Sequence, residues 1–338
     1  MVFMEMIVGT LVALVATALL ALAGWLVLLT IRFVPIIIRV FQEKPLLFQT
    51  IEPPLPDAEE VGFLTDDGIS LRGSYLRALV SPRRGLVMFC HGFGSDRWSY
   101  RNYCDFLRGE GFDIFTFDFR NHGESQAQAG YAPLQWVTDR ERADVQAALH
   151  YVKQRLGPGG TPLGLFGVSR GGGAAILAAA GDPDIRCVAA DGAFPTHGMV
   201  FTYMRRWVGI YSQRPEIYQR VPDWCYASLG HLALWLAERQ LGCRFPRLER
   251  CLGRLAPRPL LMIQGERDNY IQRPVVESFL ANGHGPRELW VVEGAKHLQG
   301  IHLAPDAYRD RVLSFFLTHL AQEEPESVEL TAGSAMAG

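Results

Sequence analysis

The sequence predicts an α/β fold with a mostly parallel central sheet, helices on both faces and one transmembrane helix ahead of the sheet. Three observations lead to this prediction. Short apolar runs alternate with helix-length segments through most of the chain, an uncharged apolar run fills residues 6–31, and a serine between glycines stands where an apolar run meets an alanine-rich segment. Alternation of this kind is typical of parallel strands joined by crossover helices.

The N-terminal apolar run is long enough to cross a bilayer. From Met6 to Ile31 there are 26 residues without Asp, Glu, Lys, Arg or His, and a bilayer core is spanned by about 20 apolar residues. A cleaved signal peptide is the alternative, but its apolar region is usually about 7–15 residues long behind a basic start. Glu5 is the only charged residue before the run. We therefore predict a retained membrane anchor, with residues 1–44 as the anchor and its flank.

The basic residues around the apolar run are all on one side of it. Arg32, Arg39 and Lys44 follow the run, and no basic residue precedes it. Because Lys and Arg are retained on the cytoplasmic side, we expect a single-pass membrane protein whose globular part faces the cytoplasm. The segment VPIII at 34–38, interrupted by Pro35, is expected to extend the membrane contact along the interface.

The rest of the chain is predicted to form one domain at residues 59–320, between a linker at 45–58 and a disordered tail at 321–338. A DDG turn at 66–68 predicts a β-hairpin. Residues 194–256, rich in aromatic residues and arginine, are expected to form a helical cap-like insertion. The other expected strands are 85–90, 112–117, 162–166, 185–190, 259–265 and 287–294, and the other expected helices are 98–109, 139–155, 171–180 and 304–320.

Composition excludes some classes of function. The formal net charge is −2 and the arginines are scattered, so no nucleic-acid-binding surface is expected. The six cysteines form no CxxC pair and show no metal-ligand spacing. No metal and no organic cofactor is implied, the cysteines are expected to be reduced, and the oligomeric state stays open.

The stretch GLFGVSRGGGAAILAAAG at 164–181 has the order strand, tight turn, helix. A nucleophile presented on a sharp turn at the end of a strand needs neighbours with almost no side chain. Gly167 and Gly171 meet that need around Ser169. The turn also directs the free amides at the start of the next helix toward the place where an oxyanion develops. Ser169 is therefore the candidate nucleophile.

A catalytic acid and then a histidine are expected after the serine along the chain. Asp268 stands just past the strand-like run PLLMIQG, and His297 just past the last such run. We expect His297 to take the hydroxyl proton and Asp268 to orient the imidazole. Two alternatives stay open: Asp191, after the preceding strand, as the acid, and His302 as the base.

A second oxyanion donor is expected in the loop after an early strand. The sequence HGFG at 91–94 follows the run GLVMFC. We expect the backbone N–H of Phe93 to pair with that of Arg170 as the oxyanion hole. His91 and Gly92 are assigned a supporting role, His91 as a hydrogen-bonding residue and not as a base.

From about Glu59 to Leu320 the chain resembles the α/β-hydrolase superfamily. The resemblance is carried by HGFG (91–94), DFRNHGES (118–125), GVSRGG (167–172), GERD (265–268) and GAKH (294–297). It implies that Asp118, Arg120 and His122 brace the site. The double glycine after Ser169 and Arg170 is similar to serine aminopeptidase and prolyl-oligopeptidase-like members, and the anchor makes the chain resemble membrane-tethered members that hydrolyse lipids or thioesters.

The leading hypothesis is a membrane-anchored serine hydrolase that cleaves a carboxylic ester or a thioester through an acyl-enzyme. Its partners are expected to be a small-molecule or lipid-like acyl substrate and the membrane, through residues 6–31. The aromatic residues of 194–256 either accept an acyl chain or pack as the core of the cap, and Arg205 and Arg206 meet either a lipid head group or solvent. A serine peptidase acting on short peptides and a non-catalytic membrane-tethered binding protein are the alternatives.

Overall fold

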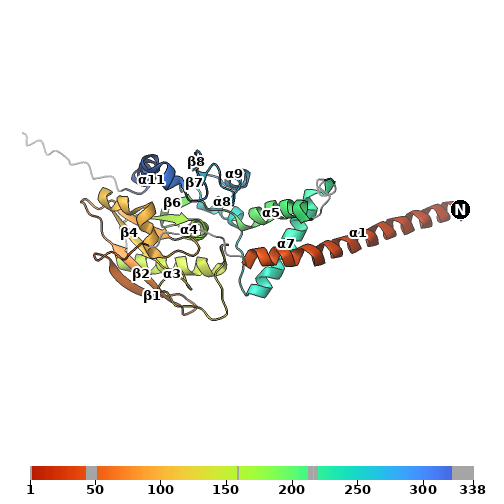
Figure 1. The fold of residues 1–338 in the computed structure, drawn as a ribbon, viewed down its shortest axis with the longest axis horizontal. Helices are drawn as coiled ribbons and strands as arrows, with labels where there is room; N and C mark the ends of the chain where they lie inside the picture. Colours follow the sequence, from red (N-terminus) through yellow and green to blue (C-terminus); the bar gives the residue numbers. More distant parts are fainter. Residues whose placement is uncertain (1, 43–51, 158–159, 212–215, 217–219, 322–338) are drawn as a thin grey trace, which may run out of the picture.

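A long N-terminal helix and an α/β domain make up the part of the chain that the computed structural model describes, residues 2–42, 52–157, 160–211, 216 and 220–321 (Figure 1). Much of the predicted linker and all but Ala321 of the predicted tail lie outside these residues. The domain boundaries drawn from the sequence therefore stay predictions.

The α/β domain is built on a central sheet of eight strands in the order β1-β2-β4-β3-β5-β6-β7-β8. β1 and β2 form the predicted hairpin and pair antiparallel, β2 is antiparallel to β4, and all other neighbours are parallel. Gly68 closes the hairpin with φ 82°, a left-handed conformation that glycine adopts without steric cost. The strands are β1 (Glu59–Leu64), β2 (Ser70–Leu76), β3 (Gly85–Cys90), β4 (Phe112–Phe117), β5 (Leu163–Val168), β6 (Ile185–Asp191), β7 (Leu260–Gly265) and β8 (Arg287–Val292).

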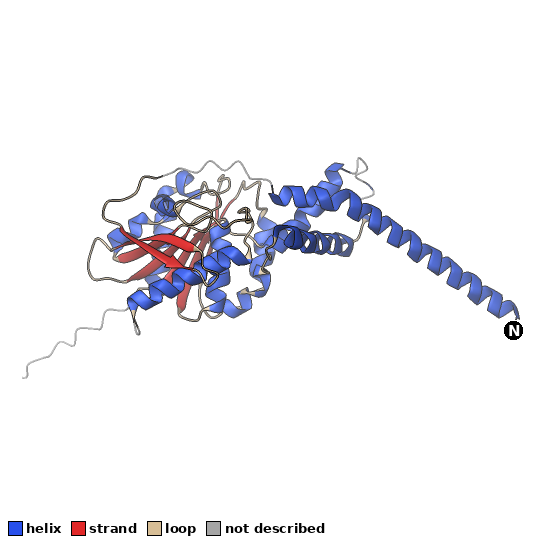
Figure 2. Ribbon diagram, turned by 90° about the horizontal axis from the view of Figure 1, so that it is seen from below, coloured by secondary structure: helices blue, strands red, loops and turns tan. Residues whose placement is uncertain are grey.

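Helices cover both faces of the sheet, as the sequence predicts (Figure 2). The central strands β3, β4, β5 and β7 are buried at every position, because both of their faces lie against helices. One face packs against α3 (Asp139–Leu156), α4 (Arg170–Gly181), α8 (Leu252–Leu255) and α9 (Arg273–Ala281). The other packs against η1 (Arg97–Ser99), α2 (Tyr100–Tyr103), η2 (Asp105–Glu110), α10 (Gly300–Leu303) and α11 (Pro305–His319).

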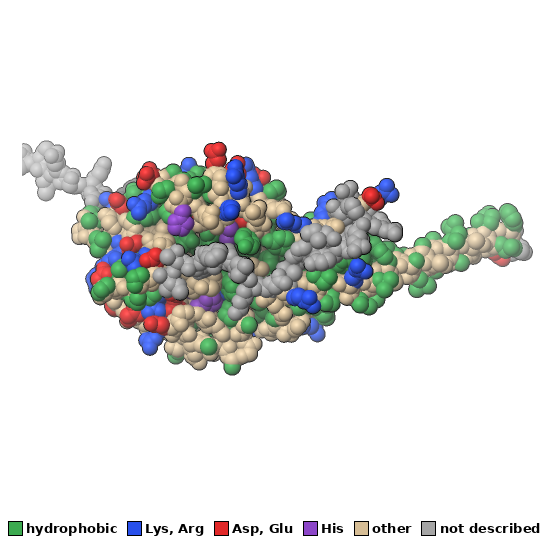
Figure 3. Space-filling model, viewed as in Figure 1, with side chains coloured by type: hydrophobic (Ala, Val, Ile, Leu, Met, Phe, Trp, Pro, Cys, Tyr) green, Lys and Arg blue, Asp and Glu red, His purple; other side chains and the backbone are tan. Residues whose placement is uncertain are grey.

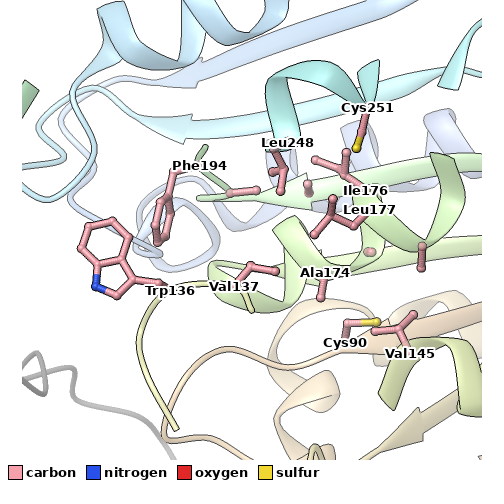
Figure 4. Packing of buried hydrophobic residues seen from close by; sticks show 14 of the residues in the cluster. Cys90, Trp136, Val137, Val145, Ala174, Ile176, Leu177, Phe194, Leu248 and Cys251 are labelled. Carbon is pink, nitrogen blue, oxygen red and sulfur yellow. The ribbon is translucent and has the colours of Figure 1, made fainter. Parts of the chain in front are cut away.

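Helix α4 lies at the centre of the first hydrophobic layer (Figure 4). Its small residues, including Ala174, let the helix approach the sheet closely, and Ile176 and Leu177 are almost fully buried. Trp136 and Phe194 lie in the same cluster, with ring centroids 5.6 Å apart in an edge-to-face arrangement. The hydrophobic core therefore supports the N-terminal end of α4.

The segment between β6 and β7 leaves the sheet and returns to it. It contains α5 (Thr196–Tyr211), α7 (Asp223–Leu241), η3 (Leu248–Arg250) and α8. α5 and α7 pack on each other and project from the domain (Figure 1), and we call this pair the cap. In contrast, α8 packs on α4 and belongs to the layer that covers the sheet.

The N-terminal helix α1 (Val2–Gln42) continues through Pro35, so the interruption expected there is wrong. From Phe3 to Arg39 it is long and apolar enough to cross a membrane, by length and composition. Its C-terminal part packs against α7, and Phe33, Val34 and Ile37 are buried there. A proline removes one helical hydrogen bond, and packing against the cap holds this part of the helix in place.

Candidate active site

Ser169 occupies a sharp turn between β5 and α4. Its backbone has φ 52° and ψ −119°, a conformation rare for a residue with a side chain. A Cβ at position 167 would lie 2.5 Å from the carbonyl oxygen of Gly171, and a Cβ at position 171 would collide with the carbonyl oxygens of Cys90 and His91. Both glycines are therefore required by the close approach of the backbone around Ser169.

The side chains of Ser169, His297 and Asp268 form one chain of hydrogen bonds. Ser169 Oγ lies 3.2 Å from His297 Nε2, and His297 Nδ1 lies 2.7 Å from Asp268 Oδ2. The residues follow three parallel strands, β5, β8 and β7, whose carboxyl ends meet at one edge of the sheet. The side chains of His297 and Asp268 are only 5% and 1% exposed, so this contact is shielded from water.

The Asp268 carboxylate is held by donors of its own loop. The backbone N–H groups of Tyr270 and Ile271 donate to Oδ1 at 2.8 and 2.9 Å, and Gln264 Nε2 lies 3.3 Å from Oδ2. These bonds orient Oδ2 toward His297. Gln264 was not singled out from the sequence, because it is a strand residue that lies just outside the GERD motif at 265–268.

Neither of the two alternatives left open by the sequence, Asp191 and His302, takes part in this series of hydrogen bonds. Asp191 is the last residue of β6, and its Oδ2 accepts a 2.9 Å hydrogen bond from the Tyr308 hydroxyl. Burial raises the pKa of Asp191 to about 6. The backbone carbonyl oxygen of Asp191 accepts a 2.7 Å hydrogen bond from the backbone N–H of Ser169. His302 is exposed on α10.

The HGFG loop follows β3 and lies against the turn at Ser169. His91 is fully buried, and its Nε2 accepts a hydrogen bond from the Phe119 amide at 3.1 Å. The proton therefore lies on Nδ1, which donates to the Gly92 carbonyl oxygen at 2.7 Å. Burial, with the nearby positive charges, lowers the pKa of His91 well below its usual value, so this ring is neutral and part of the scaffold.

Asp118, Arg120 and His122 lie in the loop after β4 and bind neighbouring elements. Asp118 accepts bonds from the backbone and the guanidinium of Arg97. The buried Arg120 is paired with Asp144 of α3 at 2.7 Å. His122 Nδ1 lies 2.9 Å from the Arg120 carbonyl oxygen. Arg97 was missed in the sequence, where nothing distinguishes it from the other arginines.

The Arg170 side chain connects this loop to α4. Its guanidinium is fully buried, lies 3.2 Å from His122 Nε2 and donates to the Leu134 carbonyl oxygen at 2.9 Å. It also lies 5.4 Å from the centroid of the Phe93 ring, within range of a cation–π contact. The sequence pointed only to the amide of Arg170, whereas its side chain also fixes the position of the Phe93 loop.

A small cleft with a cavity volume of about 30 Å³, partly open to solvent, lies over Ser169 and His297. Its walls are mainly apolar and come from the HGFG loop, the cap and the loop after β7. The lining residues are Phe93, Gln135, Trp136, Ser169, Phe194, Met199, Tyr203, Tyr270, Ile271 and His297. Among the residues that the structure describes, no cluster of three His, Cys, Asp or Glu side chains could hold a metal ion.

This fold, with a serine on a turn after the fifth strand, defines a class of proteins, the α/β hydrolases. The model of the alpha/beta hydrolase family matches residues 87–311. The chain therefore belongs to the α/β-hydrolase family, as the resemblance in its motifs implied. The membrane-anchored, serine aminopeptidase-like subtype stays a hypothesis.

Relatives and solved structures agree with this assignment. The chain is 26% identical over 270 residues to the uncharacterized protein YfhR of Escherichia coli O157:H7, a span of 78% of this chain and 82% of that protein. It is 35% identical over 136 residues to the thiohydrolase aneE of Aspergillus aculeatus, 38% of this chain and 39% of that one. The Pyrococcus furiosus esterase Pf2001 matches with a TM-score of 0.59 and 22% identity, over 81% of this chain and 97% of that one. Membership of the α/β-hydrolase family supports a hydrolase activity.

Proposed function

We propose that this chain is a membrane-anchored serine hydrolase that cleaves a carboxylic ester or a thioester through an acyl-enzyme. The observation that carries the proposal is the chain of hydrogen bonds from Ser169 through His297 to Asp268. It joins a hydroxyl, an imidazole and a carboxylate in the order that nucleophilic acyl transfer needs.

In this mechanism Ser169 Oγ attacks the acyl carbon while His297 Nε2 takes its proton. Asp268 holds the proton on Nδ1 and stabilises the imidazolium. The backbone N–H groups of Phe93 and Arg170 stabilise the oxyanion, and the one at Arg170 gains from its place at the N-terminus of α4. His297 then protonates the leaving alcohol or thiol, and a water molecule deacylates Ser169 by the same route.

The cleft favours an acyl ester or thioester over a peptide. Aromatic and aliphatic side chains form most of its described wall, and none of the lining residues there carries a carboxylate to hold a peptide amine. An esterase and a thiohydrolase are among the proteins to which the chain is similar. A lipid-like acyl substrate is therefore the proposed partner, ahead of a short peptide.

Helix α1 supports the membrane assignment. Its apolar stretch is almost fully exposed to the surroundings, which is unfavourable in water and favourable in a bilayer. Arg32 and Arg39 at its C-terminal end favour a catalytic domain on the cytoplasmic side by the positive-inside rule.

The test is labelling of membrane fractions with a fluorophosphonate probe. The wild type should be labelled and Ser169→Ala should not. Ser125→Ala is the control and should keep the label, because Ser125 lies in the loop after β4 and not in the cleft. A panel of acyl esters, thioesters and aminoacyl amides then separates an esterase from a peptidase. Labelling that persists in Ser169→Ala, or a folded wild type that is never labelled, would reject the serine mechanism and favour a non-catalytic binding protein.

A further inference from the structure

The register of α1 in a bilayer brings the cap close to the membrane surface. If the span begins at Met6, where the uncharged run begins, about 20 residues bring the chain to Trp25, and tryptophan is a residue typical of the membrane interface. From Leu29 onward, α1 packs against the hydrophobic cluster that it shares with the cap. At 1.5 Å per residue, this contact starts only about 6 Å beyond Trp25.

The cap itself points toward the membrane. The C-terminal half of α5 and the beginning of α7 lie next to each other, because Arg205 of α5 pairs with Asp223 at the start of α7 at 3.1 Å. Both views show these adjoining ends directed along α1 toward its N-terminal half (Figures 1 and 2). We call this part of the cap, residues 205–206 and 220–224, the cap tip.

The exposed side chains of the cap tip are of the kind that bind a lipid surface. Trp224 is 57% exposed at the first turn of α7, although large apolar side chains are usually covered. Arg205, Arg206 and Arg220 are also exposed, and so are the acidic residues Glu216 and Asp223. Basic side chains also gather where α1 meets the cap (Figure 3). Aromatic rings at head-group level and basic residues facing anionic lipids both favour binding to the cytoplasmic leaflet.

We propose that the cap tip rests in the head-group layer of the leaflet on the side of the catalytic domain, and that the cleft takes an amphiphilic long-chain ester or thioester from that leaflet. This inference rests on the proposed function and makes its substrate class specific. The enzyme then contacts the membrane at two places, the span of α1 and the cap tip. Together these contacts fix the orientation of the catalytic domain on the membrane surface.

Helix α5 connects the cap tip to the cleft. Met199 and Tyr203 line the cleft, and Arg205 of the cap tip follows Tyr203 by two residues, or about 3 Å along the helix axis. The Tyr203 hydroxyl donates a 2.6 Å hydrogen bond to the Tyr270 carbonyl oxygen, in the loop that carries Asp268. The same helix therefore carries residues of both the cap tip and the cleft, which brings the cleft close to the leaflet from which the substrate is taken.

Tryptophan quenching tests the position of the cap tip. Full-length protein is reconstituted in phosphatidylcholine vesicles that contain lipid brominated near the head group. Trp224→Phe should remove part of the quenched fluorescence. Trp235→Phe is the matched control, because this exposed residue lies about three turns further along α7 on a similar side, away from the tip. Equal losses in the two variants, or no loss in Trp224→Phe, overturn the proposal.

Substrate presentation tests the supply from the leaflet. Trp224→Ala should slow hydrolysis of a long-chain ester embedded in vesicles by roughly fivefold, through weaker interfacial binding, and leave a short-chain soluble ester unaffected; Trp235→Ala should change neither. Equal effects on both substrates overturn the proposal. Failure of the serine mechanism is distinguishable, since hydrolysis of the soluble ester would then survive in Ser169→Ala while the quenching result stands.

Discussion

The Nδ1 atom of His297 lies 2.7 Å from Oδ2 of Asp268, whereas the other carboxylate near the histidine, Asp191, is bonded by Tyr308. We therefore expect Asp268→Asn to lower kcat by about 10⁴, because an amide cannot hold the proton on Nδ1. Asp191→Asn should lower it by less than about tenfold. Steady-state kinetics of the two purified variants decides between the acids, and the reverse ranking would assign the role to Asp191.

Ser169 and His297 are expected to act as one unit. Either Ser169→Ala or His297→Ala should reduce kcat by about 10⁴–10⁶, and the double variant should lose little more. His302→Ala is the control, because His302 is exposed on α10, and it should retain activity. A double variant in which the two losses multiply would show that the residues do not share one proton-transfer step.

The glycines of α4 should differ sharply in their tolerance of a methyl group. A Cβ at position 171 would collide with the backbone of β3 and the HGFG loop, so Gly171→Ala should destabilise the fold by at least about 1–3 kcal/mol. Gly181, at the other end of the same helix, has open space around it. Gly181→Ala should leave stability within about 1 kcal/mol of wild type or raise it. Denaturant unfolding measures both, and similar midpoints would contradict the close approach at Gly171.

The buried Asp191 carboxyl predicts a pH-dependent stability. Burial raises the pKa of this carboxyl to about 6. Between about pH 4 and 6 the folded chain therefore keeps a proton on Asp191 that the unfolded chain has released. This group makes the free energy of unfolding fall as the pH rises through that range. Asp191→Asn removes the effect. The melting temperature of the variant relative to wild type should therefore increase from pH 4 to pH 7, by an amount that corresponds to at most about 3 kcal/mol. A difference that does not change with pH would contradict the burial of an ionisable carboxyl there.

Two phenylalanines of α1 separate packing against the cap from insertion into lipid. Phe33 is 5% exposed beside the cap, and Phe3 is 78% exposed at the far end of the helix. Phe33→Ala should destabilise the α1–α7 contact by roughly 3 kcal/mol and accelerate amide hydrogen exchange in α7. Phe3→Ala should leave that exchange unchanged. Equal exchange in both variants would show that α1 does not support the cap.

The positions of the strands along the chain, the two helical layers and the family could be predicted from local patterns. Apolar runs buried on both faces show in the sequence as continuous stretches such as GLVMFC, and the turn at Ser169 shows as glycines on both sides. Most elements differ from those expected by only a few residues at their ends, but the helix expected at 98–109 is divided into η1, α2 and η2. The broken helix expected at Pro35 was wrong, since the packing of α1 against α7 is a contact between segments about 200 residues apart.

By itself, the sequence determined which side chains follow the strands at the reacting edge, because strand ends and glycine turns are local features of the chain. It left open which of two carboxylates is the catalytic acid and which of two histidines is the base. Only the tertiary structure decided which of these side chains contact one another. The Tyr308 hydroxyl of α11 donates a hydrogen bond to Asp191, and the backbone N–H groups after β7 orient Asp268 toward His297. The partners of Arg97 and Arg170, and the place of the cap beside α1, depend in the same way on packing between segments that no local pattern brings together.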